Sequence, residues 1–320
     1  MEYRRLGKSG LKVSEIALGA WLTYGGSEKE ETTRACVKTA VDHGINFIDL
    51  ADVYARGEAE RVVGKVIREL GLRRQDLVLS SKVFFPMSDN VNDRGLSRKH
   101  IMESVENSLR RLGTDYLDIY FCHRYDVETP VEEVVRAMDD LVRQGKVLYW
   151  GTSVWSAEQI EAAVSAAQMF NAYAPQVEQP RYNMLDRHIE PEIMPAATRH
   201  GMGLVVFSPL AQGLLTGKYN EGIPADSRAA RSHWLDRDLT EENIAKVRRL
   251  TELAQGLGLT MAQLALAWLL RRPELSAVIT GASRAGHVKA NVKASGLHLP
   301  LDVQEQIDGV LDNDPLARSG

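Results

Sequence analysis

The sequence has few cysteines and no excess of positive charge, and each absence excludes a class of protein. Only Cys36 and Cys122 occur among 320 residues, so a disulfide framework is not expected and a reducing, cytoplasmic compartment fits. Asp and Glu number 43 against 39 Lys and Arg, for a net charge of -4. Because nonspecific nucleic-acid binding needs a positive field, we expect no nucleic-acid partner.

The sequence also has no long hydrophobic run. Its most apolar stretch, residues 257–270, contains Thr260 and Gln263, and it is too short and too polar to cross a bilayer. The first five residues carry charges with no apolar run behind them, so they do not predict a secretory signal. We therefore expect no membrane insertion.

The composition predicts a folded protein with a substantial core. With 44% hydrophobic and 26% charged residues, the chain can bury a substantial core without disulfides or metals. Its length alone is compatible with two domains. No Pro/Ser-rich linker or block of like charges divides it, however, so we expect one domain over residues 1–320.

Short aliphatic runs alternate with stretches of helical spacing, such as Ile101, Val105, Leu109 and Leu112. Strands separated by helices run parallel with right-handed crossovers, and eight such units predict a closed (β/α)8 TIM barrel. The expected strands are residues 15–18, 47–49, 77–82, 117–122, 147–152, 176–178, 203–207 and 277–280.

Three further elements are expected around the barrel. Residues 3–13 form two extended runs about a Gly-Lys-Ser-Gly turn, which predicts a β-hairpin that closes the bottom. Residues 240–255 and 301–311 predict two added helices. A doubly wound sheet is the alternative fold, but no G-x-G-x-x-G string follows a strand. The string at 213–219 has one residue too few for a phosphate loop and no Ser or Thr after its lysine.

Catalytic residues of such barrels lie at the carboxyl ends of the strands. Asp49 ends the second expected strand, Lys82 ends the third, and His123 follows the fourth. Asp49 and Lys82 are expected to pair, because either charge would be costly alone in a buried strand; a purely structural ion pair is the alternative. Tyr54 lies five residues beyond Asp49, and a neighbouring lysine favours its phenolate and makes the phenol a usable general acid.

This set of residues excludes several other chemistries. It has no strong nucleophile and no carboxylate pair for sugar hydrolysis. Cys122 and His123 are adjacent on a strand and point to opposite faces, and no H-E-x-x-H or C-x-x-C spacing occurs, so we expect no metal. His123 alone could equally be a core residue. Asp49, Tyr54, Lys82 and His123 together could protonate and orient a carbonyl group, but they cannot supply electrons for its reduction. A bound hydride donor would supply them.

The last strands carry candidate ligands for an anionic cofactor. Gly281-Ala282-Ser283-Arg284 opens a helix at the place where barrels often bind phosphate. A rigid turn at residues 207–213 is followed by Lys218 and Arg228. Each cation alone would fit a solvated loop, but the cluster predicts an anionic cofactor.

These motifs resemble those of the aldo-keto reductases over essentially the whole length. The resemblance is carried by Asp49-x4-Tyr54, Ser80-Ser81-Lys82, the segments 118–123 (DIYFCH) and 151–153 (GTS), Phe207-Ser208-Pro209-Leu210 and Gly281-Ala282-Ser283-Arg284. Residues 3–11, 95–101 and 149–153 are similar to the branch that contains the potassium-channel β subunits.

The resemblance implies an NADPH-dependent oxidoreductase that reduces aldehydes or ketones, with the catalytic tetrad Asp49, Tyr54, Lys82 and His123. It also implies a homotetramer or larger homo-oligomer. The predicted cofactor contacts are Trp21, Asp49, Ser153, Gln179, Phe207, Ser208, Pro209, Leu210, Gly213, Lys218, Arg228, Gly281, Ser283, Arg284, His287 and Asn291. The aromatic residues predicted near the mouth of the barrel are Trp21, Tyr24, Phe84, Phe85 and Trp155. They suggest a substrate pocket for small or aromatic aldehydes. Core packing explains some of them equally well.

Some positions depart from the channel-subunit branch. That branch has asparagine where this chain has His123, so the resemblance favours a working reductase. Val154, His287 and Ala290 stand where arginine, glutamine and glutamate are usual. An NADPH-binding regulatory or redox-sensing subunit with little turnover remains the alternative function.

Overall fold

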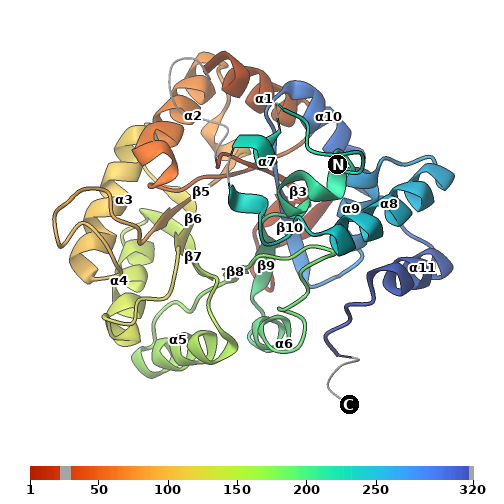
Figure 1. The fold of residues 1–320 in the computed structure, drawn as a ribbon. Coiled ribbons are helices and arrows are strands. Elements are labelled where there is room, and N and C mark those ends of the chain that lie inside the picture. Colours follow the sequence, from red (N-terminus) through yellow and green to blue (C-terminus); the bar gives the residue numbers. More distant parts are fainter. Residues whose placement is uncertain (22–29, 226, 232, 317–320) are drawn as a thin grey trace.

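Eight parallel strands close into a barrel in the computed structural model, which describes residues 1–21, 30–225, 227–231 and 233–316 (Figure 1). The strands neighbour one another in the order β10-β3-β4-β5-β6-β7-β8-β9. Their bounds are β3 Ile16–Gly19, β4 Phe47–Asp49, β5 Val78–Val83, β6 Leu117–Cys122, β7 Val147–Ser153, β8 Val177–Gln179, β9 Gly203–Val206 and β10 Leu275–Gly281. Each predicted strand is confirmed to within two residues at its ends, and the open-sheet alternative is excluded.

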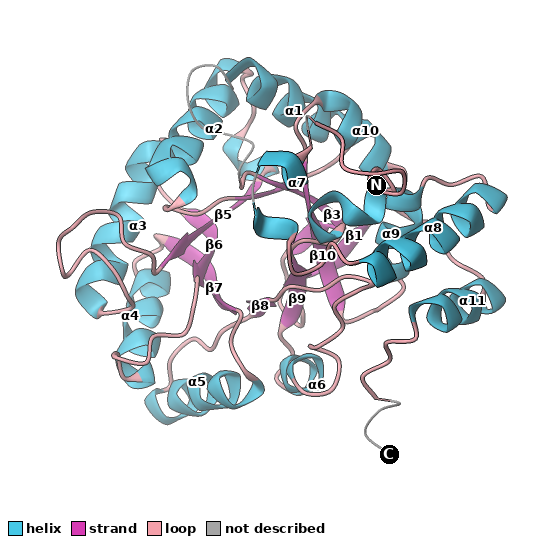
Figure 2. Cartoon of the chain, viewed as in Figure 1, coloured by secondary structure: helices cyan, strands magenta, loops and turns pink. Residues whose placement is uncertain are grey.

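A ring of helices surrounds the strands (Figure 2). Ser97 accepts a hydrogen bond from the His100 N–H and so caps the helix that begins at residue 98. Pro130 likewise directly precedes the helix at residue 131. The ring comprises α1 Glu30–Asp42, α2 Glu58–Glu69, α3 Arg98–Leu112, α4 Val131–Arg143, α5 Ala157–Phe170, α6 Ile193–Arg199, α9 Met261–Leu270 and α10 Ala285–Val292.

The predicted hairpin is confirmed as β1 Tyr3–Arg5 paired antiparallel with β2 Lys12–Ser14. Its Leu6 and Val13 are buried in one cluster with Phe47 and Val78, which lie at the starts of their strands. The hairpin therefore covers the amino-terminal end of the barrel. Gly7 makes this approach possible, because its φ is +57° and an added Cβ would lie 2.2 Å from the carbonyl oxygen of Gly201.

Two helices lie beyond the ring and match the prediction closely. They are α8 Glu241–Gly256 and α11 Leu301–Leu311, which pack against each other. A one-turn helix, α7 Arg228–Arg231, and four 3-10 turns complete the described chain: η2 Tyr54–Gly57, η3 Arg74–Asp76, η4 Ala211–Thr216 and η5 His233–Leu235.

The most apolar segment of the sequence forms α9, whose side chains are buried from Leu264 to Leu270 against the barrel. No single helix in the described part of the chain is long and apolar enough to span a membrane; α8 and α9 meet that criterion only when they are joined across a 90° bend.

The interior of the barrel changes from apolar to polar along the strands. Its lower part is filled by side chains such as Phe47, Ile119 and Val205. At the carboxyl ends the buried side chains are polar instead, including Asp49 and Lys82. Burying these polar groups is costly unless each finds a partner, so the upper end is where chemistry is expected.

Candidate active site

Lys82 lies at the centre of the polar end of the barrel. Its Nζ donates hydrogen bonds to Asp49 Oδ2 at 2.7 Å, to the Leu50 carbonyl oxygen at 2.6 Å and to Tyr54 Oη at 3.1 Å. The lysine side chain is fully buried, and all three of its N–H donors have an acceptor. The predicted pairing of Asp49, Lys82 and Tyr54 is thus present.

Asp49 is held by two further strands. Its Oδ1 accepts hydrogen bonds from Ser80 Oγ at 2.8 Å and from Gln179 Nε2 at 3.0 Å. Sequence reasoning did not assign a role to Ser80. The signal was available, because Ser80 and Lys82 are two residues apart on one strand and therefore face the same side.

The charge on Lys82 is maintained despite its burial. Burial by itself lowers the pKa of Lys82, but the Asp49 carboxylate and the Tyr54 hydroxyl outweigh it, so the pKa lies above its usual value. The lysine is therefore an ammonium ion at neutral pH.

Tyr54 is a neutral phenol in the resting site. Burial raises the pKa of Tyr54 above its usual value, and the Lys82 ammonium is the largest opposing influence. Lys82 favours the phenolate as expected, but burial raises the pKa by more, so that the net shift is upward. A protonated phenol beside an ammonium ion can give up its proton when a basic oxygen approaches, since the phenolate left behind is stabilised by Lys82.

His123 lies beside Tyr54 at the end of β6. Its ring packs edge-on against Tyr54 with centroids 6.0 Å apart, and against Phe85 at 4.9 Å. Burial holds the pKa of His123 well below its usual range, and the charges of Lys82 and Arg124 lower it further. A neutral imidazole results, which can orient a carbonyl oxygen through a hydrogen bond.

Three of the loops that follow barrel strands, those after β4, β7 and β9, have strained backbones. Eight non-glycine residues of the described chain have positive φ, and six of them lie on loops that follow barrel strands: Ala55, Arg56, Val154, Ser208, Ala211 and Gln212. The remaining two, Asn171 and Asp312, end helices. Strain of this kind gathers at functional sites, and none of the sequence motifs indicates it.

Several of the predicted cofactor contacts lie at or just after the ends of β7, β8 and β9. Ser153 Oγ donates to the Gln179 carbonyl oxygen at 2.9 Å, and Gln179 in turn binds Asp49. On the loop after β9, Phe207 and Ser208 are half-buried. The Oε1 of Gln212 is buried with no hydrogen-bond partner in the described chain, which leaves a free acceptor for a bound group.

A basic cluster of Lys218, Arg284 and His287 lies farther out. Arg284 Nε is 2.9 Å from His287 Nε2, and Ser283 Oγ is 3.3 Å from His287 Nδ1. Burial lowers the pKa of His287, and the nearby charges of Arg284 and Lys218 lower it further. Neither cation forms an ion pair with a carboxylate of the described residues. Unpaired cations beside a helix start fit an anionic group such as a pyrophosphate.

The remaining predicted cofactor contacts are distributed around this cluster. An added Cβ at Gly213 would lie 2.9 Å from Lys218 Nζ, so the glycine turn and the lysine are adjacent. Asn291 is buried on α10. Arg228 begins α7, and its side chain lies outside the described structure. Pro209 is buried, Leu210 is half-buried, and Gly281 ends β10 with open space beside it.

The five predicted pocket aromatics separate in the structure. Phe84 and Phe85 pack edge to face with centroids 5.3 Å apart, and Phe85 continues to His123. Trp21 is half-buried just beyond β3. Trp155 is 1% exposed and packs against Tyr125 in the core, and Tyr24 lies outside the described residues.

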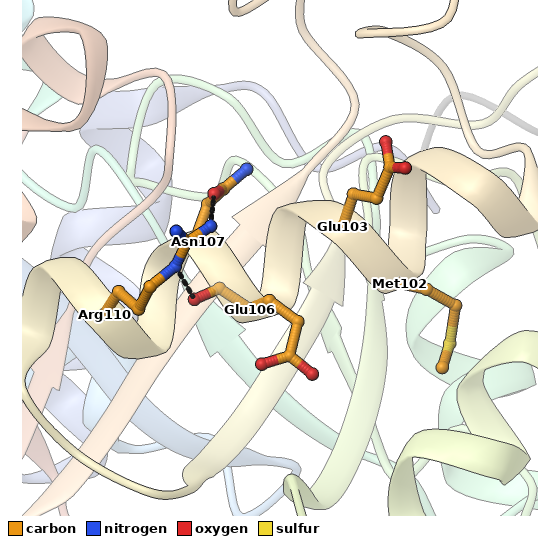
Figure 3. Close-up of a pocket in the computed structure, with 5 residues that line it drawn as sticks. All are labelled: Met102, Glu103, Glu106, Asn107 and Arg110. Atoms are coloured by element: carbon orange, nitrogen blue, oxygen red, sulfur yellow. Dashed lines mark hydrogen bonds between the residues drawn. The ribbon is translucent and has the colours of Figure 1, made fainter.

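A hollow elsewhere on the surface is not part of this site. Met102, Glu103, Glu106, Asn107 and Arg110 line it on the outer face of α3 (Figure 3). Glu103 pairs with Lys99 and Glu106 with Lys146. Arg110 donates hydrogen bonds to the side chain of Asn107 and to the carbonyl oxygen of Glu106. Each charged side chain that lines the hollow thus has a partner within the described chain.

A closed barrel with a buried Asp-Lys-Tyr group, a neutral histidine and a basic cluster at its carboxyl end defines a class of oxidoreductase that works with a bound nucleotide. Residues 15–312 match the model of the aldo/keto reductase family, and the chain belongs to this family. Membership supports a nicotinamide cofactor and confirms the family resemblance of the motifs.

Similar proteins cover almost the whole chain. A protein described as a voltage-gated potassium channel β subunit from Arabidopsis thaliana is 47% identical over 98% of both chains. One so described from Oryza sativa subsp. japonica is 45% identical over 98% of both. A third, from Schizosaccharomyces pombe, is 44% identical over 98% of this chain and 94% of its own.

Proposed function

We propose that this chain reduces aldehydes or ketones to alcohols with NADPH. The observation that carries the proposal is the bridge that Lys82 makes from Asp49 to Tyr54, beside the ring of His123. Such an arrangement holds a protonated phenol next to a fixed positive charge. It suits a reaction in which a carbonyl oxygen gains negative charge and then a proton.

Each of the four residues at the site has one role in the proposed reaction. NADPH, when bound, supplies the hydride that the carbonyl carbon receives. Tyr54 Oη donates a proton to the carbonyl oxygen, and the Lys82 ammonium stabilises the phenolate that remains. Asp49 keeps the lysine charged and fixed. His123, neutral because of its burial, orients the carbonyl oxygen by a hydrogen bond.

The basic cluster supports NADPH in preference to NADH. Lys218 and Arg284 have no carboxylate partner in the described chain, so they are free to bind the 2′-phosphate that only NADPH carries. Ser153 and Gln179 lie next to Asp49, where they would hold the carboxamide of the nicotinamide ring. Phe207 lies at the end of β9 on the same side, where it would pack against that ring.

Turnover and binding together test this proposal. The purified protein is mixed with NADPH and a panel of aliphatic and aromatic aldehydes, and NADPH oxidation is followed by absorbance while NADPH affinity is measured by calorimetry. We expect tight binding and steady oxidation that depends on the aldehyde. Tight binding without oxidation for any carbonyl compound would contradict the reductase.

The second candidate is a regulatory subunit that binds NADPH with little turnover. It is favoured by the three relatives, whose descriptions name a potassium-channel β subunit. The complete Asp49-Tyr54-Lys82 contact set with a histidine beside it supports the reductase instead. The experiment above separates the two candidates.

A further inference from the structure

Arg124 adjoins the catalytic group but has no role in the mechanism above. It follows His123 on the loop after β6, and its guanidinium donates a hydrogen bond to the His123 carbonyl oxygen. Its Cζ lies 5.4 Å from the centre of the Phe85 ring, which itself packs against His123. The side chain is half-buried. A cation therefore lies beside Phe85, whose ring packs against the candidate catalytic residue His123.

Arg124 has no carboxylate within ion-pair distance among the described residues. Comparable arginines with little exposure, such as Arg74 and Arg111, pair with Asp118 and Glu60. The nearest acid in sequence, Asp126, is committed elsewhere, because it accepts hydrogen bonds from the N–H groups of Leu96 and Glu128 and from the Thr129 hydroxyl.

Glu178, on β8 two strands away from β6, is committed as well. The Glu178 carboxylate accepts hydrogen bonds from the Thr152 hydroxyl and the Trp155 N–H. The guanidinium has five N–H donors, and the one acceptor that the described chain gives it is the His123 carbonyl oxygen. Donors remain for an external group.

The loop holds Arg124 in a fixed position. On one side Tyr125 packs edge-on against Trp155 with ring centroids 4.9 Å apart. On the other, Asp126 ties the loop to Leu96, and an added Cβ at Gly95 would lie 2.6 Å from Asp126 Oδ2. Because its neighbours on the loop are anchored, Arg124 can recognise a ligand with little loss of conformational entropy.

We propose that Arg124 binds a carboxylate of the substrate, so that the preferred substrates are aldehydes or ketones with a carboxylate beyond the reacting carbonyl. This inference rests on the proposed reductase function. A planar guanidinium presents two parallel N–H donors that match the two oxygens of a carboxylate. The ring of Phe85, between Arg124 and His123, offers a flat apolar wall for the part of the substrate that joins the two ends.

A pair of substrates with the same shape and different charge tests the proposal. 4-Formylbenzoate and 4-formylbenzamide differ only in that a carboxylate replaces a neutral amide. The wild-type protein should show a kcat/KM for the carboxylate that is about tenfold to a hundredfold higher, which is the usual range for a charged hydrogen bond. Arg124→Gln should abolish this ratio mainly through KM, and Arg124→Lys should retain part of it.

Controls separate recognition from a general electrostatic effect. Arg110→Gln removes one positive charge from the outer face of α3 and should leave the ratio unchanged. If Arg124→Gln lowers kcat for both substrates equally and keeps their ratio, Arg124 acts on Tyr54 or His123 and not on the substrate, and the proposal is wrong. Equal kcat/KM for both substrates in the wild type also overturns it, while the reductase function stands.

Failure of the reductase function has a different signature. If neither aldehyde is reduced, that function is contradicted, and binding of 4-(hydroxymethyl)benzoate measured by calorimetry then decides the role of Arg124. Binding by the wild type that is lost in Arg124→Gln and kept in Arg110→Gln supports a carboxylate site. Equal binding by all three proteins, or none by the wild type, overturns it.

Discussion

Lys82 Nζ and Asp49 Oδ2 lie 2.7 Å apart, with side chains 0% and 4% exposed. An ion pair so deeply buried gains little net stability, because desolvating both charges offsets their attraction. Here the lysine has a third contact, to Tyr54 Oη at 3.1 Å. The pair is therefore better explained by its effect on the tyrosine than by a contribution to folding.

Removing the phenol oxygen of Tyr54 should abolish most turnover and spare the fold. We expect Tyr54→Phe to lower kcat by at least about a hundredfold, the low end of a general-acid contribution, with unchanged NADPH affinity by calorimetry. Tyr173→Phe, at a tyrosine that is 55% exposed, is the matched control and should be fully active. Near-normal turnover by a folded Tyr54→Phe protein would eliminate Tyr54 as the acid.

Breaking the ion pair on one side should cost more stability than removing both charges. Lys82→Met leaves Asp49 buried and unpaired, and we expect a loss of about 3 to 5 kcal/mol in the free energy of unfolding. Lys82→Met combined with Asp49→Asn should recover much of that stability in chemical denaturation and remain inactive. Equal stability of the single and double variants would argue against a coupled pair.

Ionisation of the buried Asp52 carboxyl group should lower the free energy of unfolding as the pH rises. It is fully buried, and burial with the nearby Glu60 charge raises its pKa from 3.8 to about 7. Between these values the folded state binds a proton that the unfolded state does not, so the free energy of unfolding falls from about pH 4 to pH 7. Burial raises the pKa of Glu178 to about 7 and adds to the same trend.

Asp52→Asn tests this linkage because the amide cannot ionise. We expect its free energy of unfolding to fall less steeply over that pH range than the wild type's, measured by urea denaturation at several pH values. The variant keeps an acceptor for the Ser104 hydroxyl. Parallel pH profiles for the two proteins would show that Asp52 does not titrate in this window.

Arg284 should discriminate between the two nicotinamide cofactors. It is exposed at the start of α10, and it contacts His287 without pairing with any carboxylate of the described chain. Arg284→Ala should weaken NADPH binding by about tenfold or more, as expected for a charged hydrogen bond to phosphate, and should change NADH binding little. Lys289→Ala, an exposed cation on the same helix, is the control. Equal losses for both cofactors would show that Arg284 does not read the 2′-phosphate.

Local sequence patterns are enough to predict the barrel and the positions of its main catalytic candidates. Alternating apolar runs and helical spacing are local patterns, and eight parallel units admit few topologies. Asp49 and Lys82 end strands, and His123 follows one, so their arrival at one end of the barrel follows from the topology.

The burial and the pairing of the site residues depend instead on contacts between segments that are distant in sequence. Gln179 binds Asp49 across 130 residues of sequence, and no local pattern encodes that distance. The pKa of Tyr54 rises because burial outweighs Lys82, and burial depends on all the elements packed around a group. The same cause places Trp155 in the core and leaves Arg124 without a carboxylate in the described chain. The desolvation of a group and its distance from a partner depend on which distant segments pack around it. The sequence therefore predicts which residues lie at the site but not how each is buried and paired.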